Sequence, residues 1–156
     1  MKQSHSGGTG DEPGEAVDSA TSDVASHVSE RVIGVGTDLV DVPQLARALI
    51  RTPGMKDRIF TLAEWTYAQR YKDPSQHLAA RFAAKEAVMK SLGKGMGDMS
   101  FDEIEVTRDD SGKPSVSLYG RALEVATEAR VLRFEVSLTH TATMAHSMVT
   151  AIGRVE

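Results

Sequence analysis

The sequence predicts a single α+β domain in which a largely antiparallel sheet packs against helices. The chain has 156 residues, about the length of one domain. Its apolar pattern changes along the chain in the order strand, helices, hairpin, helix, hairpin, and this order is typical of the α+β class. Aromatic residues make up only 5% of the chain, so we expect a core of aliphatic side chains and Met.

Residues 1–30 are predicted to form a disordered acidic tail, and residues 31–156 the folded domain. The tail holds six Asp or Glu residues against Lys2 alone, and it has no Leu, Ile, Phe, Tyr or Trp. Such a segment buries too little apolar surface to offset the entropy lost on ordering. Subtracting the tail from the 18 basic and 22 acidic residues of the chain leaves 17 and 16, so the domain is nearly neutral. The sequence leaves open whether the tail is dispensable, binds a partner or is autoinhibitory.

The composition excludes several classes of protein. Without Cys the chain has no disulfide, thiol nucleophile or Cys-based zinc site. The residues after Met1 are polar and no run of 18 apolar residues occurs, so neither a secretory signal peptide nor a membrane span is expected. The domain has no basic stripe interleaved with aromatic residues, which argues against nucleic-acid binding. We therefore expect a cytoplasmic protein with no membrane or nucleic-acid partner.

A strand is predicted over residues 31–42, where the side chains alternate in character. One face carries Ile33, Val35, Thr37 and Leu39, and the other Gly34, Gly36, Asp38 and Val40. We expect the first set to be the apolar face of the strand. Pro43 suits the first turn of a helix over residues 44–51, which Pro53 and Gly54 end.

Two further helices are predicted in the middle of the chain. Residues 61–64 have the capping-box pattern, which indicates a short helix through Tyr71. Apolar residues at helical spacing predict a longer helix over residues 75–92, with Gly93 as its C-cap. Residues 94–100 are rich in Gly and Met and indicate a loop.

The rest of the domain is predicted to be two hairpins separated by one helix. The first hairpin has strands near residues 104–106 and 116–118, joined by a turn at 109–114. A helix is expected over residues 121–129. The second hairpin has strands near residues 134–138 and 148–152, joined by a turn at 141–145.

Gly34, Gly36 and Asp38 lie in a row on one face of the first strand, because side chains alternate with a period of two. Glycine in a strand lets a ligand or another backbone approach closely. Asp38 stands at the end of this strip, either as a metal ligand or as a turn-initiating residue at the end of a strand. The segment is not a dinucleotide-binding fingerprint, since Leu39 stands where that pattern needs Gly.

Glu86 and Lys90 are four residues apart, so they share one face of the predicted helix. An ordinary exposed ion pair is one interpretation, but the small and apolar residues around them favour a functional one. Mg²⁺ takes one or two protein carboxylates, several waters and phosphate oxygens. Asp38 and Glu86 could supply the carboxylates while Lys90 neutralises phosphate charge, which indicates metal-assisted chemistry on a phosphate or pyrophosphate.

His140 lies at the end of a predicted strand, between Thr139 and Thr141. With a hydroxyl on either side it could bind phosphate, and the alternative is an ordinary turn or surface histidine. The nearby Ser137 lacks the Gly-x-Ser-x-Gly context of a hydrolase nucleophile, so a serine hydrolase is not expected.

Four motifs, in this order, resemble those of the holo-[acyl-carrier-protein] synthases, the small 4′-phosphopantetheinyl transferases. They are the strand Ile33–Val40, the helix Arg81–Lys90 followed by Gly93 and Gly95, the turn Gly112-Lys113-Pro114 and the segment Val136–Thr141. The resemblance covers about residue 31 to the end of the chain and leaves the acidic tail out. It implies the 4′-phosphopantetheinyl transferase-like form of the α+β class.

The resemblance implies transfer of 4′-phosphopantetheine from coenzyme A to a serine of apo acyl carrier protein, in fatty-acid or polyketide synthesis. Adenosine 3′,5′-bisphosphate would be released. The implied catalytic residues are Asp38, Glu86 and Lys90. Asp38 and Glu86 would hold Mg²⁺, with Mn²⁺ as the alternative, and Glu86 would accept the serine proton directly or through a water. The residues implied to contact coenzyme A are Arg81, Lys90, Gly93, Gly112, Lys113, Pro114, His140 and Thr141.

The resemblance also implies a homotrimer with sites between subunits, in which His140 would serve a neighbouring chain. A carrier protein is acidic, and residues 43–73 hold six basic residues against three acidic ones. We predict that this basic segment, with Arg47 and Arg51, is the docking surface for the carrier protein. Gln44 departs from the family, whose members often have a basic residue there, and Asp41 stands where Glu is common.

Two alternative functions remain. A non-catalytic module that binds coenzyme A or a nucleotide predicts phosphate binding without turnover, and the retained Asp38, Glu86 and Lys90 argue against it. The other alternative is a different metal-dependent phosphotransferase, and only substrate tests distinguish it from a 4′-phosphopantetheinyl transferase.

Overall fold

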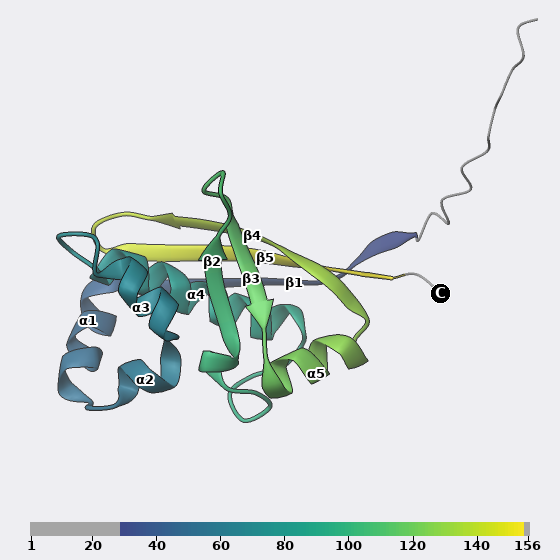
Figure 1. The fold of residues 1–156 in the computed structure, drawn as a ribbon, viewed down its shortest axis with the longest axis horizontal. Helices are drawn as coiled ribbons and strands as arrows, with labels where there is room; N and C mark the ends of the chain where they lie inside the picture. Colours follow the sequence, from purple (N-terminus) through teal and green to yellow (C-terminus); the bar gives the residue numbers. More distant parts are fainter. Residues whose placement is uncertain (1–28, 155–156) are drawn as a thin grey trace, which may run out of the picture.

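The structure is a computed structural model, and it describes residues 29–154. Its elements follow the chain in this order (Figure 1): β1 (Glu30–Asp41), α1 (Val42–Arg51), α2 (Met55–Ile59), α3 (Leu62–Ala68), α4 (Ser75–Ser91), the 3₁₀ turn η1 (Phe101–Glu103), β2 (Ile104–Arg108), β3 (Pro114–Leu118), α5 (Gly120–Glu128), β4 (Val131–His140) and β5 (Met144–Arg154). The α+β prediction is confirmed. The predicted acidic tail lies outside the described residues, apart from Ser29 and Glu30, and β1 already begins at Glu30.

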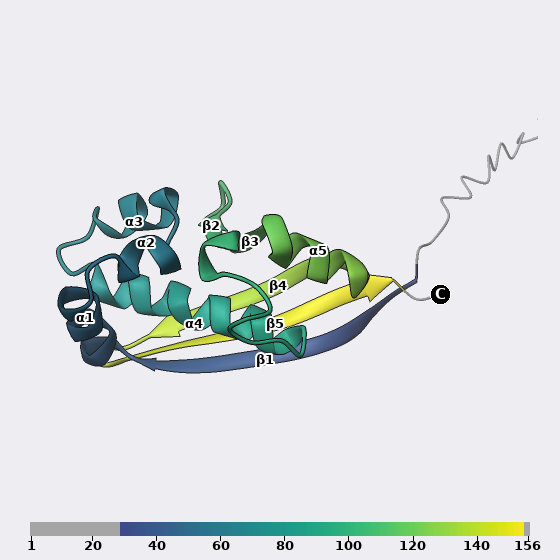
Figure 2. The same ribbon diagram turned by 90° about the horizontal axis from the view of Figure 1, so that it is seen from below.

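An antiparallel sheet in the order β1-β5-β4 forms one layer of the molecule. Figure 2 shows α4 lying along one face of this sheet, with α3, α5 and the separate β2–β3 hairpin beyond it. Both hydrophobic clusters include residues of α4, so the core lies around this helix. Among the described residues, no helix is long and apolar enough to cross a membrane.

The strand predicted over residues 31–42 is confirmed, but its apolar face is not the face that packs on the core. Gly36 and Val40 are buried, whereas Val35 and Leu39 are 60% and 62% exposed. A Cβ atom on Gly36 would fall on the carbonyl oxygen of Ala87 in α4, and one on Gly34 on that of Ser91. The glycine face is therefore the core face, because glycine lets the backbone of α4 pack directly against β1.

The start of α3 and the end of α4 follow their local signals closely. Thr61 and Glu64 form the predicted capping box, with N–H···O distances of 3.3 Å and 2.9 Å. Helix α3 stops at Ala68, before the predicted Tyr71. Gly93 follows α4 with φ +65°, the left-handed conformation that suits glycine after a helix. Helix α2 was not predicted, because five residues are too few to show a helical period.

A buried ion pair ties α4 to α3 and to the β2–β3 hairpin. The Lys85 Nζ atom lies 2.7 Å from the Glu64 carboxylate, and both side chains are completely buried. Lys85 also donates to the carbonyl oxygens of Ile59 and Phe101, while Glu64 accepts from the N–H of Val106. Burial lowers the pKa of Lys85, and the charge of Glu64 opposes that effect. This network fixes the position of the hairpin relative to α4.

Candidate active site

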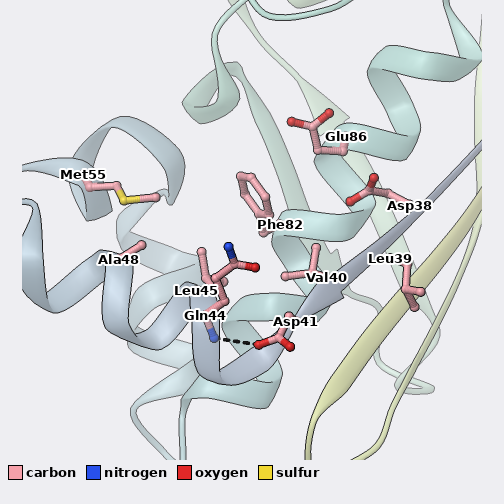
Figure 3. A pocket seen from close by; sticks show the side chains of 10 residues that line it. All are labelled: Asp38, Leu39, Val40, Asp41, Gln44, Leu45, Ala48, Met55, Phe82 and Glu86. Carbon is pink, nitrogen blue, oxygen red and sulfur yellow. Dashed lines mark hydrogen bonds between the residues drawn. The ribbon is translucent and has the colours of Figure 1, made fainter.

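Asp38 and Glu86 lie at one end of a cleft of about 410 Å³ between β1, α1 and α4 (Figure 3). Asp38 comes from the glycine face of β1, and Glu86 from the part of α4 that packs over this strand. The rest of the cleft is mainly apolar, and its other lining residues are Leu39, Val40, Asp41, Gln44, Leu45, Ala48, Met55 and Phe82. The structure thus brings together the two carboxylates that the sequence analysis singled out.

Lys90 completes a charged group with these two carboxylates. Its Nζ atom donates to the Asp38 carboxylate at 2.8 Å and to the Thr37 carbonyl oxygen at 3.0 Å. Burial raises the pKa of Glu86, and the nearby charge of Asp38 raises it further, while Lys90 opposes both. Two carboxylates therefore share one cationic partner, and an added cation would relieve their repulsion.

Asp38 and Glu86 are the residues that could hold a divalent cation. Within residues 29–154, no group of three or more His, Asp or Glu side chains is placed to hold a metal ion. A cation bound here would therefore need further ligands from water and substrate. This donor set fits Mg²⁺, which commonly combines one or two carboxylates with waters and phosphate oxygens.

Arg81 lies on a different side of α4 from Glu86, because five helical residues turn about 140° around the axis. It lines a second cleft, of about 420 Å³, between α3, α4 and the β2–β3 hairpin. Gly112 of the hairpin turn lines the same cleft, as do Tyr67, Arg70 and Arg108. One chain therefore presents Arg81 and the carboxylates of Asp38 and Glu86 in separate clefts.

The guanidinium of Arg81 is buried without a carboxylate partner among the described residues. Arg81 is 2% exposed, and its Nη1 donates to the carbonyl oxygen of His77 at 3.3 Å. Its Nε has no hydrogen-bond partner within residues 29–154. Burial lowers the pKa of Arg81. Arg70 and Arg108 approach the same Tyr67 ring as Arg81, and Asp109 and Asp110 also line this cleft. The three guanidiniums gathered at one ring could contact an anionic ligand.

The other predicted contacts of coenzyme A are spread around the molecule. Lys113 pairs with Glu135 at 2.9 Å on the surface, and Pro114 begins β3. His140 contacts the ring of His77, with centroids 5.5 Å apart. The Thr141 hydroxyl accepts from the N–H groups of Thr143 and Met144, and Gly93 follows the Lys90 end of α4.

Sequence reasoning missed the aromatic residues next to Arg81. Tyr67 lies under its guanidinium, and Tyr71 stacks on His77 with centroids 3.6 Å apart. Nothing in the local sequence around His77 indicated a partner. The four-residue spacing of Tyr67 and Tyr71 was a signal that these two rings lie on one side of the chain.

Comparison with known proteins agrees with this architecture. Residues 34–147 match the 4′-phosphopantetheinyl transferase superfamily. The chain is 42% identical over 125 residues to the holo-[acyl-carrier-protein] synthase of Moorella thermoacetica, covering 80% of this chain and 94% of that protein.

Two solved structures are similar at 29% sequence identity. The holo-[acyl-carrier-protein] synthase from Neisseria meningitidis has a TM-score of 0.71, with 78% of this chain and 98% of that chain covered. The synthase from Bacillus anthracis, in complex with CoA (3′,5′-ADP), has a TM-score of 0.65, with 78% and 97% covered. By this similarity over most of its described part, the chain belongs to the 4′-phosphopantetheinyl transferase superfamily and, within it, to the holo-[acyl-carrier-protein] synthases.

Proposed function

We propose that this chain transfers 4′-phosphopantetheine from coenzyme A to a serine of apo acyl carrier protein, in support of fatty-acid synthesis. The observation that carries the proposal is the group Asp38, Glu86 and Lys90 at the end of a cleft, in a member of this family. The Bacillus anthracis relative is itself described in complex with CoA (3′,5′-ADP).

In the proposed reaction, the serine oxygen attacks the phosphorus that carries the pantetheine arm. A new P–O bond forms as the bond from this phosphorus to the bridging oxygen breaks, which releases adenosine 3′,5′-bisphosphate. We assign Glu86 to accept the serine proton, directly or through a water, because its carboxylate lines the cleft beside Asp38. Lys90 neutralises phosphate charge. Mg²⁺ or Mn²⁺ held by Asp38 and Glu86 would supply charge stabilisation at the pyrophosphate oxygens.

Intact-mass spectrometry tests the proposed function. Purified apo acyl carrier protein, incubated with the chain, coenzyme A and Mg²⁺, should gain about 340 Da, the mass added by one phosphopantetheine arm. EDTA should abolish the gain. No gain with several carrier proteins, while coenzyme A still binds, would instead support the non-catalytic binding module.

The affinity of the carboxylate pair for a divalent cation is expected to rise with pH. Glu86 must lose its proton to bind the cation, and its pKa is raised. As the pH is lowered, the affinity should therefore begin to fall at a higher pH than it would for carboxylates with an ordinary pKa. Without a cation, the raised pKa means that Glu86 favours the folded state while protonated. Its contribution to stability is therefore lost as the pH rises from the ordinary glutamate value through the raised one.

Titration with Mn²⁺, followed by electron paramagnetic resonance between about pH 5 and pH 8, checks this prediction. The Glu86→Gln variant should bind weakly and lose most of the pH dependence. An affinity of the wild-type chain that does not change with pH would contradict the assignment of Glu86 as a cation ligand.

We propose that coenzyme A is held between subunits of a homotrimer. The proposed coenzyme A contacts Arg81 and Gly112 lie in a different cleft from Asp38 and Glu86, so two neighbouring chains could complete one site. The sheet face turned away from α4 supports association, because Val35, Leu39 and Met148 expose about half or more of their surface there. Sedimentation equilibrium tests the trimer, and a mass of one chain would contradict it.

The basic segment, residues 43–73, is the proposed docking surface for the carrier protein, with α1 at its centre. Helix α1 buries Leu45 and exposes Arg47, Ile50 and Arg51, and Ile50 is 82% exposed. Gln44, Leu45 and Ala48 of the same helix line the cleft that ends at Asp38 and Glu86. A partner docked on α1 would therefore lie beside the carboxylate pair.

Reversing the charge of both Arg47 and Arg51 to Glu is expected to raise the KM for the carrier protein about tenfold or more at low salt. The KM for coenzyme A should stay within about twofold, because charges on an exposed docking helix act on the protein partner. Steady-state kinetics with each substrate varied in turn measures the two constants. The matched control reverses Arg31 and Arg154, which are exposed at the opposite end of β1 and β5. An equal rise of both KM values would contradict docking on α1.

A further inference from the structure

A continuous series of ring contacts links Arg81 on α4 to His140 at the end of β4. The Arg81 guanidinium lies 4.0 Å from the centroid of the Tyr67 ring. The hydroxyls of Tyr67 and Tyr71 are 2.9 Å apart, and their ring centroids are 5.5 Å apart. Tyr71 stacks on His77, and His77 meets His140 edge to face at 5.5 Å. Both ends of this aromatic series are residues proposed to contact coenzyme A.

Tyr67 is the member of the series whose side chain contacts the Arg81 guanidinium, and few other groups hold that guanidinium in place. Within residues 29–154, no carboxylate lies within ion-pair distance of Arg81, and its Nε has no hydrogen-bond partner. Its hydrogen bond to the His77 carbonyl, at 3.3 Å, is long. A guanidinium is attracted to the face of an aromatic ring, and this attraction strengthens when water is excluded, as it is around the buried Arg81.

The ring of Tyr67 is itself held on a fixed element. It belongs to α3, whose first turn is tied to α4 through the buried pair of Glu64 and Lys85. Its hydroxyl end is held by Tyr71, which lies beyond the end of the helix. The ring lies against the guanidinium and can fix its orientation, while most of the guanidinium N–H groups stay available to an anionic ligand.

We propose that Tyr67 is a positioning residue for coenzyme A: its ring holds the Arg81 guanidinium in one orientation in the second cleft, and its contact with Tyr71 aligns Arg81 with His140. The inference rests on the proposed function, since it takes Arg81 and His140 to contact coenzyme A. It adds a residue that orients a phosphate-binding side chain without touching the phosphate.

The test compares Tyr67→Leu with Tyr67→Phe. Tyr67→Leu removes the ring, so the Kd for adenosine 3′,5′-bisphosphate and the KM for coenzyme A should both rise about tenfold, which corresponds to about 1.4 kcal/mol. The kcat and the KM for the carrier protein should stay within about twofold. Tyr67→Phe keeps the ring and should bind nearly as the wild-type chain does. Tyr119→Leu is the matched control, because Tyr119 is 51% exposed and lies outside the aromatic series.

A double-mutant cycle separates positioning from a general effect on folding. Arg81→Lys removes the planar guanidinium, so adding Tyr67→Leu to it should weaken binding less than about twofold further.

If Tyr67→Leu lowers the Tm but leaves the Kd unchanged, the role is structural and the inference is overturned. An equal rise of both KM values overturns it as well. If Tyr67→Leu does not fold, Tyr67→Met takes its place in the cycle. Absence of transfer by the wild-type chain would reject the proposed function itself, before any variant is measured.

Discussion

Glu86→Gln is expected to lower kcat for phosphopantetheine transfer by about a thousandfold or more. The change removes the proposed proton acceptor, and general-base catalysis typically contributes about 10²–10⁴ in rate. It also removes one of the two carboxylates proposed to hold the cation. Gln has nearly the same size and shape as Glu, so the packing of α4 on β1 should be unchanged. The rate at which an apo carrier protein gains about 340 Da measures the effect.

Glu124→Gln is the matched control for this experiment. Glu124 is an exposed glutamate of α5 that pairs with Arg121 and lines neither of the two clefts. It should transfer phosphopantetheine at the wild-type rate. A Glu86→Gln variant that keeps a rate within tenfold of the wild type would show that the reaction does not need this carboxylate.

Lys85→Met is expected to lower the free energy of unfolding by about 3–5 kcal/mol, the range found when one partner of a buried ion pair is removed. The variant leaves the Glu64 carboxylate buried without its cation. It also leaves the carbonyl oxygens of Ile59 and Phe101 without the donor that they share. Equilibrium unfolding in urea, followed by circular dichroism, measures the loss.

Lys90→Met, on the same helix, is the matched control for stability. Its partner is Asp38, but half of the Lys90 side chain is exposed, so the loss should be below about 1 kcal/mol. Adding Glu64→Leu to Lys85→Met should restore part of the lost stability, because it removes the buried uncompensated charge. Equal losses for the two Lys variants would mean that burial of the Lys85 pair is not the source of its effect.

Apart from the short α2 and η1, the order of elements could be predicted from sequence because each of the other elements carries its own local signal. Thr61 and Glu64 mark the start of α3, and Gly93 follows the end of α4. The buried face of β1 could not be predicted in this way. A row containing Gly34 and Gly36 has little hydrophobicity of its own, and it becomes the core face only because the backbone of α4 lies against it.

The two parts of the candidate site differ in how far the sequence could predict them. The carboxylate pair could be anticipated, because helical spacing links Glu86 to Lys90 and the glycine strip leads to Asp38. The surroundings of Arg81 could not be, because they depend on how α3, the hairpin and the end of β4 meet. His77 acquires its stacking partners only through this tertiary arrangement.

The direct packing of α4 against the glycines of β1 also has a consequence for how the site tolerates change in the core. The distance between a helix and a sheet is usually set by the side chains between them, so core substitutions shift the helix. Here the distance between α4 and β1 is set by backbone contacts at Gly34 and Gly36, next to the carboxylates of Asp38 and Glu86. Substitutions such as Val149→Ala, on the neighbouring strand β5 beneath the helix, should therefore change stability while the spacing of the carboxylates stays the same. The spacing of the two carboxylates in the proposed active site is therefore expected to be independent of substitutions in the hydrophobic core beneath it.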